Sequence, residues 1–183
     1  FDTHFSFTII NPGTPEELQR NFFKRINPGA MPLTSQEIRH ALYQGKSTEL
    51  LRELAETDEF REATGGSVND SRMAARELIL RFLAFSIRKH TDYPKNSDMD
   101  MFLSETMLLI NIMPELPEEK LSKIFRNGEI PSIRFKDIEV LKRRFADGMH
   151  RAYKLFGEYA FRKSFGKKRK SPVNKALFEA WGN

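Results

Sequence analysis

Four polar side chains near the N-terminus gather around a predicted tight loop, where they could converge on a ligand. Arg25 and Asn27 lie where one predicted helix ends. After a Pro-Gly turn, Glu37 and Arg39 lie in the first turns of the next helix. Their side chains can donate and accept hydrogen bonds, so Arg25, Asn27, Glu37 and Arg39 are candidate ligand-binding residues. The alternative is structural: Arg25 pairs with Glu37, and Asn27 stabilises the turn.

A second group of candidates is a basic stripe on a long amphipathic helix, predicted from residue 132 to about residue 157. At 100° per residue, Leu141, Phe145 and Met149 fall on one face, opposite most of the cations. Such a stripe can follow a phosphate backbone, and a solvated helix face gives the same pattern. The candidate nucleic-acid-binding residues are Lys136, Arg143, Arg144, Arg151, Lys154, Lys167, Lys168, Arg169 and Lys170.

The positive charge is concentrated in this part of the chain. Residues 142–170 contain eleven Lys or Arg against two Asp or Glu, whereas the remainder contains 19 against 23. A polyanionic partner such as DNA is therefore considered for this region only. Aromatic residues alternate with the cations, and their helical spacing assigns them to the core rather than to base stacking. They are Tyr153, Phe156, Tyr159, Phe161 and Phe165.

No pattern in the sequence supplies a complete catalytic or metal site. The four histidines lie far apart, and neither a Walker loop nor a G-x-S-x-G turn is present. Paired carboxylates such as Glu16 and Glu17 lie in first helical turns, where the helix dipole accounts for them. The absence of cysteine excludes disulfides and thiolate zinc sites and favours a reducing compartment. We therefore expect no catalytic residue, metal ligand or cofactor in this chain, and a cytoplasmic location.

A framework of helices must position these candidates. Capping boxes at Thr14 and Thr34 predict two helices around the Pro-Gly turn. Further helices are expected over residues 47–56, 58–63, 70–89, 98–113, 118–126, 132–157 and 173–181, and the one over 70–89 is apolar on most sides and therefore central. The expected fold class is mainly α, an irregular multi-helix bundle with one edge strand near residues 5–11. No apolar run approaches the ~20 residues that span a bilayer, so no membrane partner is expected.

Several sequence blocks resemble a known family. The string from Phe22 to Tyr43, FFKRINPGAMPLTSQEIRHALY, resembles the "F-x-R-[IL]-N … L … Q-E-[IL]-R-x-A-L" signature of the bacterial and archaeal GmrSD-type restriction family. Similar blocks follow in the family's order: RELILRFLA at 76–84, DMFL at 100–103, LFG at 155–157 with AFR at 160–162, and NKALF at 174–178. Together the blocks extend over most of the chain.

The resemblance implies a division of the chain. Residues 1–45 would be the C-terminal tail of a ParB/sulfiredoxin-like domain, and residues 46–183 a helical domain. The family's Asp-Gly-Gln-Gln-Arg motif and HNH nuclease domain are both missing, which indicates a piece of a longer protein. The nearest match to the motif, Asp147 to Arg151, falls inside the amphipathic helix and is interpreted as coincidence.

The resemblance also implies a function. The chain would be a helical segment of a modification-dependent restriction protein of phage defence, contributing to DNA or nucleotide binding and inactive alone. Arg25, Asn27 and Arg39 would be nucleotide- or phosphate-binding residues at the edge of a site completed elsewhere. The parent protein would use a nucleoside triphosphate and a divalent metal. Its partners would be DNA and a nuclease domain of the same or another polypeptide. The alternative is a non-catalytic helical scaffold or protein-interaction module that positions the nuclease domain.

Overall fold

The computed structural model describes residues 31–93, 99–125, 129–164, 166 and 169–182, together with residues 9, 11, 14, 18, 19, 21, 22 and 25. Within these residues helices dominate, and the one β-type pairing is an isolated bridge between Arg162 and Val173. The prediction of a mainly α, multi-helix fold is confirmed. The edge strand predicted at residues 5–11 lies outside the described residues except for Ile9 and Asn11.

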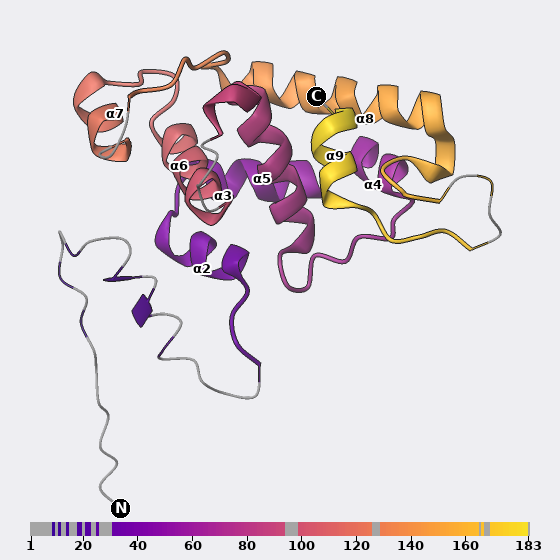
Figure 1. Ribbon diagram of the computed structural model, residues 1–183, viewed down its shortest axis with the longest axis horizontal. Coiled ribbons are helices and arrows are strands. Elements are labelled where there is room, and N and C mark those ends of the chain that lie inside the picture. The colour runs from indigo at the N-terminus through magenta and orange to yellow at the C-terminus, as the bar shows by residue number, and fades with distance from the viewer. Residues whose placement is uncertain are drawn as a thin grey trace, which may run out of the picture.

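The helices follow one another closely along the chain (Figure 1). The helix expected from residue 132 begins later, at Ile138, because the Asp137 side chain accepts a hydrogen bond from the Val140 N–H at 3.0 Å and caps it there. The elements are α2 (Ser35–Leu42), α3 (Lys46–Ala55), α4 (Asp58–Thr64), α5 (Ala74–Ile87), η1 (His90–Asp92), α6 (Met99–Asn111), α7 (Glu118–Ile124), α8 (Ile138–Phe156), η2 (Gly157–Tyr159) and α9 (Lys175–Gly182).

Helix α5 is the centre of the structure, as its apolar sequence predicts. It contacts α2, α3, α6, α8 and α9, and Ile79, Leu80 and Leu83 on it are fully buried. Burying each such side chain stabilises the fold by roughly 1.5–3 kcal/mol. Over the described residues, none of the helices combines the length and apolar character that crossing a bilayer requires.

Helix α8 runs along one edge of the bundle, with α4 and α9 beneath it (Figure 1). Its inner face buries Leu141, Phe145 and Met149, and the Phe145 ring meets the Phe82 ring of α5 edge-on at 5.2 Å. Since only one face of α8 packs, its opposite face is left to solvent along the length of the helix.

Candidate nucleic-acid interface

The outer face of α8 carries several cations that have no ion-pair partner among the described residues. Arg143, Arg151 and Lys154 are exposed, and within the described part of the chain none of the three forms an ion pair. Lys136, also exposed, precedes the helix. Two exposed acids of α8 lie among them: Asp147, and Glu139, which pairs with Lys142. We call the surface formed by Lys136, Arg143, Arg151 and Lys154 the basic face.

Two other cations of α8 are engaged by the protein itself. Arg144 is half-buried, and its guanidinium lies 4.3 Å from the centre of the Phe135 ring. Lys142 lies on the side of α8 toward α3, where its ammonium group is 2.8 Å from a Glu53 carboxylate oxygen and 3.0 Å from one of Glu139. Its hydrogen bond to Glu53, together with that to Glu139, raises the pKa of Lys142. Neither residue is as available to a ligand as the basic face.

The basic loop after α8 is only partly available to a polyanion. Lys170 pairs with Glu158 at 2.5 Å, and the hydrogen bond from Lys170 lowers the pKa of Glu158. Arg169 is exposed, whereas Lys167 and Lys168 lie outside the described residues. Since Lys170 is already paired, a phosphate would compete with Glu158 for it.

Arg162 has a structural position beneath the same loop. It is 7 % exposed and donates hydrogen bonds to the Thr64 carbonyl at 2.9 Å, the Ser67 hydroxyl at 2.7 Å and the Ser171 carbonyl. These contacts hold the segment after α8 against the end of α4. Arg162 is therefore a support for the loop and not a freely available cation.

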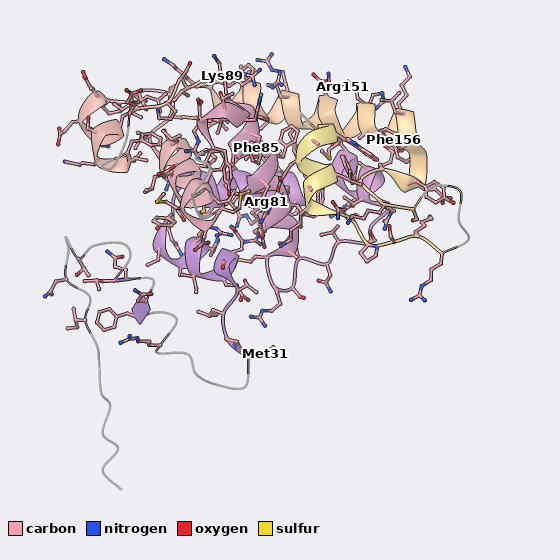
Figure 2. The ribbon with its side chains drawn as sticks, in the orientation of Figure 1. Met31, Arg81, Phe85, Lys89, Arg151 and Phe156 are labelled. Carbon is pink, nitrogen blue, oxygen red and sulfur yellow. The ribbon has the colours of Figure 1, made fainter. Side chains whose placement is uncertain are left out.

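Tertiary structure extends the basic face with residues that the sequence analysis missed. Arg134, which is exposed, donates its backbone N–H to the Ile87 carbonyl at 2.8 Å, so the segment before α8 lies beside the end of α5. Exposed Lys89 follows two residues after Ile87, and it points outward along the same edge of the molecule as Arg151 (Figure 2). Lys89 and Arg134 lie 45 positions apart in the chain, so periodicity within one helix gave no signal for them.

An apolar groove opens where α8 ends. Its volume is about 570 Å³, and it is lined by Leu155, Phe156, Tyr159, Arg162, Lys163, Leu177 and Trp181. The Phe156 and Trp181 rings stack, with their centres 4.2 Å apart and their planes 18° apart. Leu155 is 74 % exposed. We call this surface the α8–α9 groove.

The groove corrects one expectation about the aromatic residues. All five were expected in the core, and Phe161 is fully buried there. Phe156 and Tyr159 are instead half-buried in the groove wall, and Tyr153 is exposed, while Phe165 lies outside the described residues. The expectation was wrong because α8 is covered by neighbours along most of its inner face but not over its last turn, where the groove opens.

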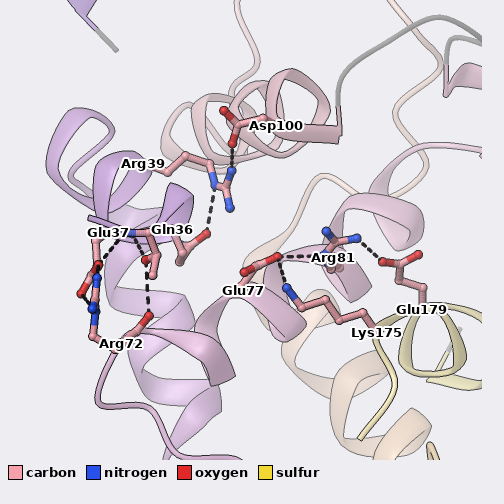
Figure 3. Close-up of polar contacts among 10 residues, drawn as sticks. Gln36, Glu37, Arg39, Arg72, Glu77, Arg81, Asp100, Lys175 and Glu179 are labelled. Atoms are coloured by element: carbon pink, nitrogen blue, oxygen red, sulfur yellow. Dashed lines mark hydrogen bonds and ion pairs between the residues drawn. The ribbon is translucent and has the colours of Figure 1, made fainter. Parts of the chain in front are cut away.

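The candidates of the N-terminal region are not equally accessible. Arg25 is exposed, and Asn27 lies outside the described residues. Arg39 is 2 % exposed; its Nε donates to the Gln36 side-chain oxygen at 3.0 Å, and its guanidinium pairs with Asp100 at the start of α6 (Figure 3). A phosphate ligand of Arg39 would therefore have to displace a carboxylate.

Glu37 pairs with Arg72 and not with Arg25 as the structural alternative supposed. Two Arg72 nitrogens donate to the two carboxylate oxygens of Glu37, each at 2.8 Å, and Glu37 also closes the predicted capping box with Thr34 (Figure 3). The hydrogen bond from Arg72 holds the pKa of Glu37 at about 2. This pair fastens the start of α2 to the segment before α5.

A charged network beside Arg39 links the two helices α5 and α9. Arg81 of α5 contacts Glu77 at 3.2 Å and Glu179 of α9 at 2.6 Å, and Lys175 reaches Glu77 at 2.8 Å (Figure 3). Burial acts to raise the pKa of Glu77, but Lys175 and Arg81 outweigh it, and the net shift is downward. A pocket of about 170 Å³ lies between Arg39 and this network. The charged side chains that line this pocket are paired with one another, and the network of Arg81, Glu77, Lys175 and Glu179 holds α9 against α5.

Arg88 is the other fully buried arginine. It donates to a Glu105 carboxylate oxygen and to the Thr106 hydroxyl, each at 2.7 Å, and to the Phe102 carbonyl, while its guanidinium lies 3.7 Å from the centre of the Phe102 ring. Burial lowers its pKa. These contacts join the end of α5 to the middle of α6.

Among the residues that the structure describes, no three acidic, histidine or cysteine side chains gather closely enough to hold a metal ion. The comparisons with known proteins add no relative: no family model, no curated protein and no solved structure matches the chain.

Proposed function

We propose that this chain binds nucleic acid through the basic face of α8, by contacts to phosphates rather than to particular bases. The observation that carries the proposal is the row of exposed cations, Arg143, Arg151 and Lys154, which form no ion pair with any described residue. Most other cations of the described chain are paired or buried. Unpaired cations in one row are what a polyanion needs.

The size of the basic face fits a phosphate backbone. From Arg143 to Lys154 the helix advances eleven residues, or about 16 Å at ~1.5 Å per residue. Duplex DNA presents one negative charge per ~1.7 Å of axis, so roughly ten phosphates lie within that length and several are within reach of long side chains. Each contact releases condensed counterions, which makes the affinity fall steeply with salt.

We extend the proposal to the parent protein on the strength of the sequence blocks quoted above. The chain would be the helical part of a GmrSD-like, modification-dependent restriction protein in the cytoplasm, inactive without the rest of the polypeptide. Residues 1–45 would be the C-terminal tail of the ParB/sulfiredoxin-like domain, with Arg25, Asn27 and Arg39 at the edge of its nucleotide site. Labelled-nucleotide binding by the full-length parent should then weaken on Arg25→Ala.

A salt titration tests the basic face directly. Binding of a fluorescent duplex is measured by anisotropy between about 50 mM and about 200 mM salt. Because each phosphate contact contributes about −0.9 to the slope of log affinity against log salt, Arg143→Gln/Arg151→Gln should make the slope less negative by about 1.8. Over this fourfold range of salt concentration, the ratio of the wild-type affinity to the variant affinity should therefore fall by about 12-fold.

The matched control removes two cations from α7, which lies away from the end of α8 (Figure 1). Lys120→Gln/Lys123→Gln lowers the net charge equally, and both positions are exposed. It should leave the slope close to that of the wild type. Equal slopes for the two double variants would refute the proposal and would favour the alternative, a helical scaffold that positions a nuclease domain without touching nucleic acid.

A further inference from the structure

The chain has a single tryptophan, and it lines the α8–α9 groove. Trp181 is 36 % exposed although it stacks on Phe156. Phe156 stacks on one face of the indole, and both rings line the groove. An aromatic ring that is backed by a second ring and still partly exposed can serve as a stacking platform for another planar group.

The groove is continuous with the basic face. Arg151 and Leu155 are four residues apart on α8, so their side chains are neighbours on the helix surface. Lys154 directly precedes Leu155, and Lys163 lines the groove itself. No acidic side chain is among the lining residues. A planar group that enters the groove can therefore be attached to an anionic chain that lies along α8.

We propose that the α8–α9 groove receives an unpaired base of a single-stranded nucleic acid whose phosphates lie along the basic face. The inference rests on the proposed function and names its substrate class. A base within a duplex is covered on both faces by its neighbours, so only a single strand, or a base displaced from a duplex, can stack on Trp181. Leu155 and Leu177 would cover the edges of the bound base.

The test uses two oligonucleotides with the same phosphates. One is an oligothymidylate of about 12 nucleotides, within the range of single-strand site sizes, and the other is an abasic strand of equal length. Trp181 fluorescence reports stacking, and anisotropy of an end label reports binding. We expect both strands to bind, the thymidylate tighter than the abasic strand, and Trp181 fluorescence to be quenched by the thymidylate alone.

Two variants connect the quenching to the groove. Trp181→Ala should weaken thymidylate binding roughly 5- to 150-fold, the usual loss for one stacked base, and should leave the abasic strand unaffected. Leu155→Asp places a negative charge at the mouth of the groove on a side chain that is already 74 % exposed, so it tests the site without disturbing the core. Tyr153→Ala removes an exposed ring on the other side of α8 and should change neither affinity.

The outcomes separate the two proposals. Equal binding of both strands with unchanged tryptophan fluorescence would overturn the base-stacking inference and leave phosphate binding by the basic face intact. Binding of neither strand would overturn both. Burial of Trp181 on self-association, seen as a fluorescence change with protein concentration alone, would show the groove to be a protein interface and would also overturn the inference.

Discussion

A close approach between α8 and α9 at Gly148 gives a prediction whose sign depends on tertiary structure. Gly148 lies on the buried side of α8, facing the end of α9. A Cβ atom added to Gly148 would lie 2.2 Å from the backbone carbonyl oxygen of Gly182, far inside van der Waals contact. Gly182 is itself confined on its other side, since a Cβ there would lie 2.7 Å from the Phe82 ring.

Two effects of Gly148→Ala oppose each other. In an unobstructed helix interior, alanine is favoured over glycine by about 1 kcal/mol. Here the methyl group forces α9 away from α8, and overpacking of this kind costs about 1–3 kcal/mol, occasionally more. The obstacle is the backbone carbonyl of Gly182, a residue packed against the buried Phe82 ring, and a backbone carbonyl cannot turn aside as a flexible side chain would. The packing cost should exceed the gain in helix propensity, and we expect the free energy of unfolding to fall by up to about 2 kcal/mol.

Urea unfolding followed by circular dichroism measures the change. The matched control is the pair His150→Ala and His150→Gly on the exposed side of the same helix, whose difference isolates the propensity term of about 1 kcal/mol. Trp181 fluorescence should also shift in Gly148→Ala, because the end of α9 has to move. A Gly148→Ala protein that is more stable than the wild type by the His150 difference would refute the reasoning.

Three further predictions concern charged residues. The pKa of Glu37 is about 2, against 4.5 in the unfolded chain, so the stabilisation that its pair with Arg72 provides is complete above about pH 4.5 and is lost as the pH falls toward 2. In urea unfolding, the difference in free energy of unfolding between wild type and Glu37→Gln should therefore narrow from about pH 6 to about pH 3. A difference that stays constant with pH would contradict this prediction. Arg88→Ala should lower the free energy of unfolding by about 3–5 kcal/mol, because Glu105 loses its partner. Arg88→Met/Glu105→Leu removes both charges and should lower it much less. Equal losses of stability for the two variants, measured by thermal and urea unfolding, would argue against this prediction. Asp147→Asn removes an acid from the basic face and should tighten nucleic-acid binding in the anisotropy assay at low salt. An unchanged affinity would count against phosphate contacts at this face.

Local sequence signals predicted the helices well. The capping box at Thr34 formed with Glu37 as its spacing indicates, and the apolar character of α5 predicted its central place. The outer face of α8 also followed from periodicity, because a helix turns by a fixed angle per residue and therefore assigns each position to a side. These are properties of segments shorter than about 20 residues.

The ion-pair partners of the charged residues were not predicted from the sequence. The spacing suggested Glu37 as the partner of Arg25, and the family resemblance suggested a phosphate ligand for Arg39. The structure instead pairs Glu37 with Arg72 and Arg39 with Asp100. Each of these contacts joins residues more than thirty positions apart. Long-range pairing depends on how the helices are arranged around α5, and no repeat within one helix encodes it.

The sequence by itself determined which residues are helical, which helix lies at the centre, and which face of α8 bears its cations. Only the tertiary structure decided which of those cations stay unpaired, that Lys89 and Arg134 extend their row, and that the end of α8 meets α9 to leave Trp181 in an open groove. The reason is physical. A helix is held by hydrogen bonds to the fourth residue along the chain, whereas a groove or an ion pair between helices depends on side chains that approach one another only after the core has packed.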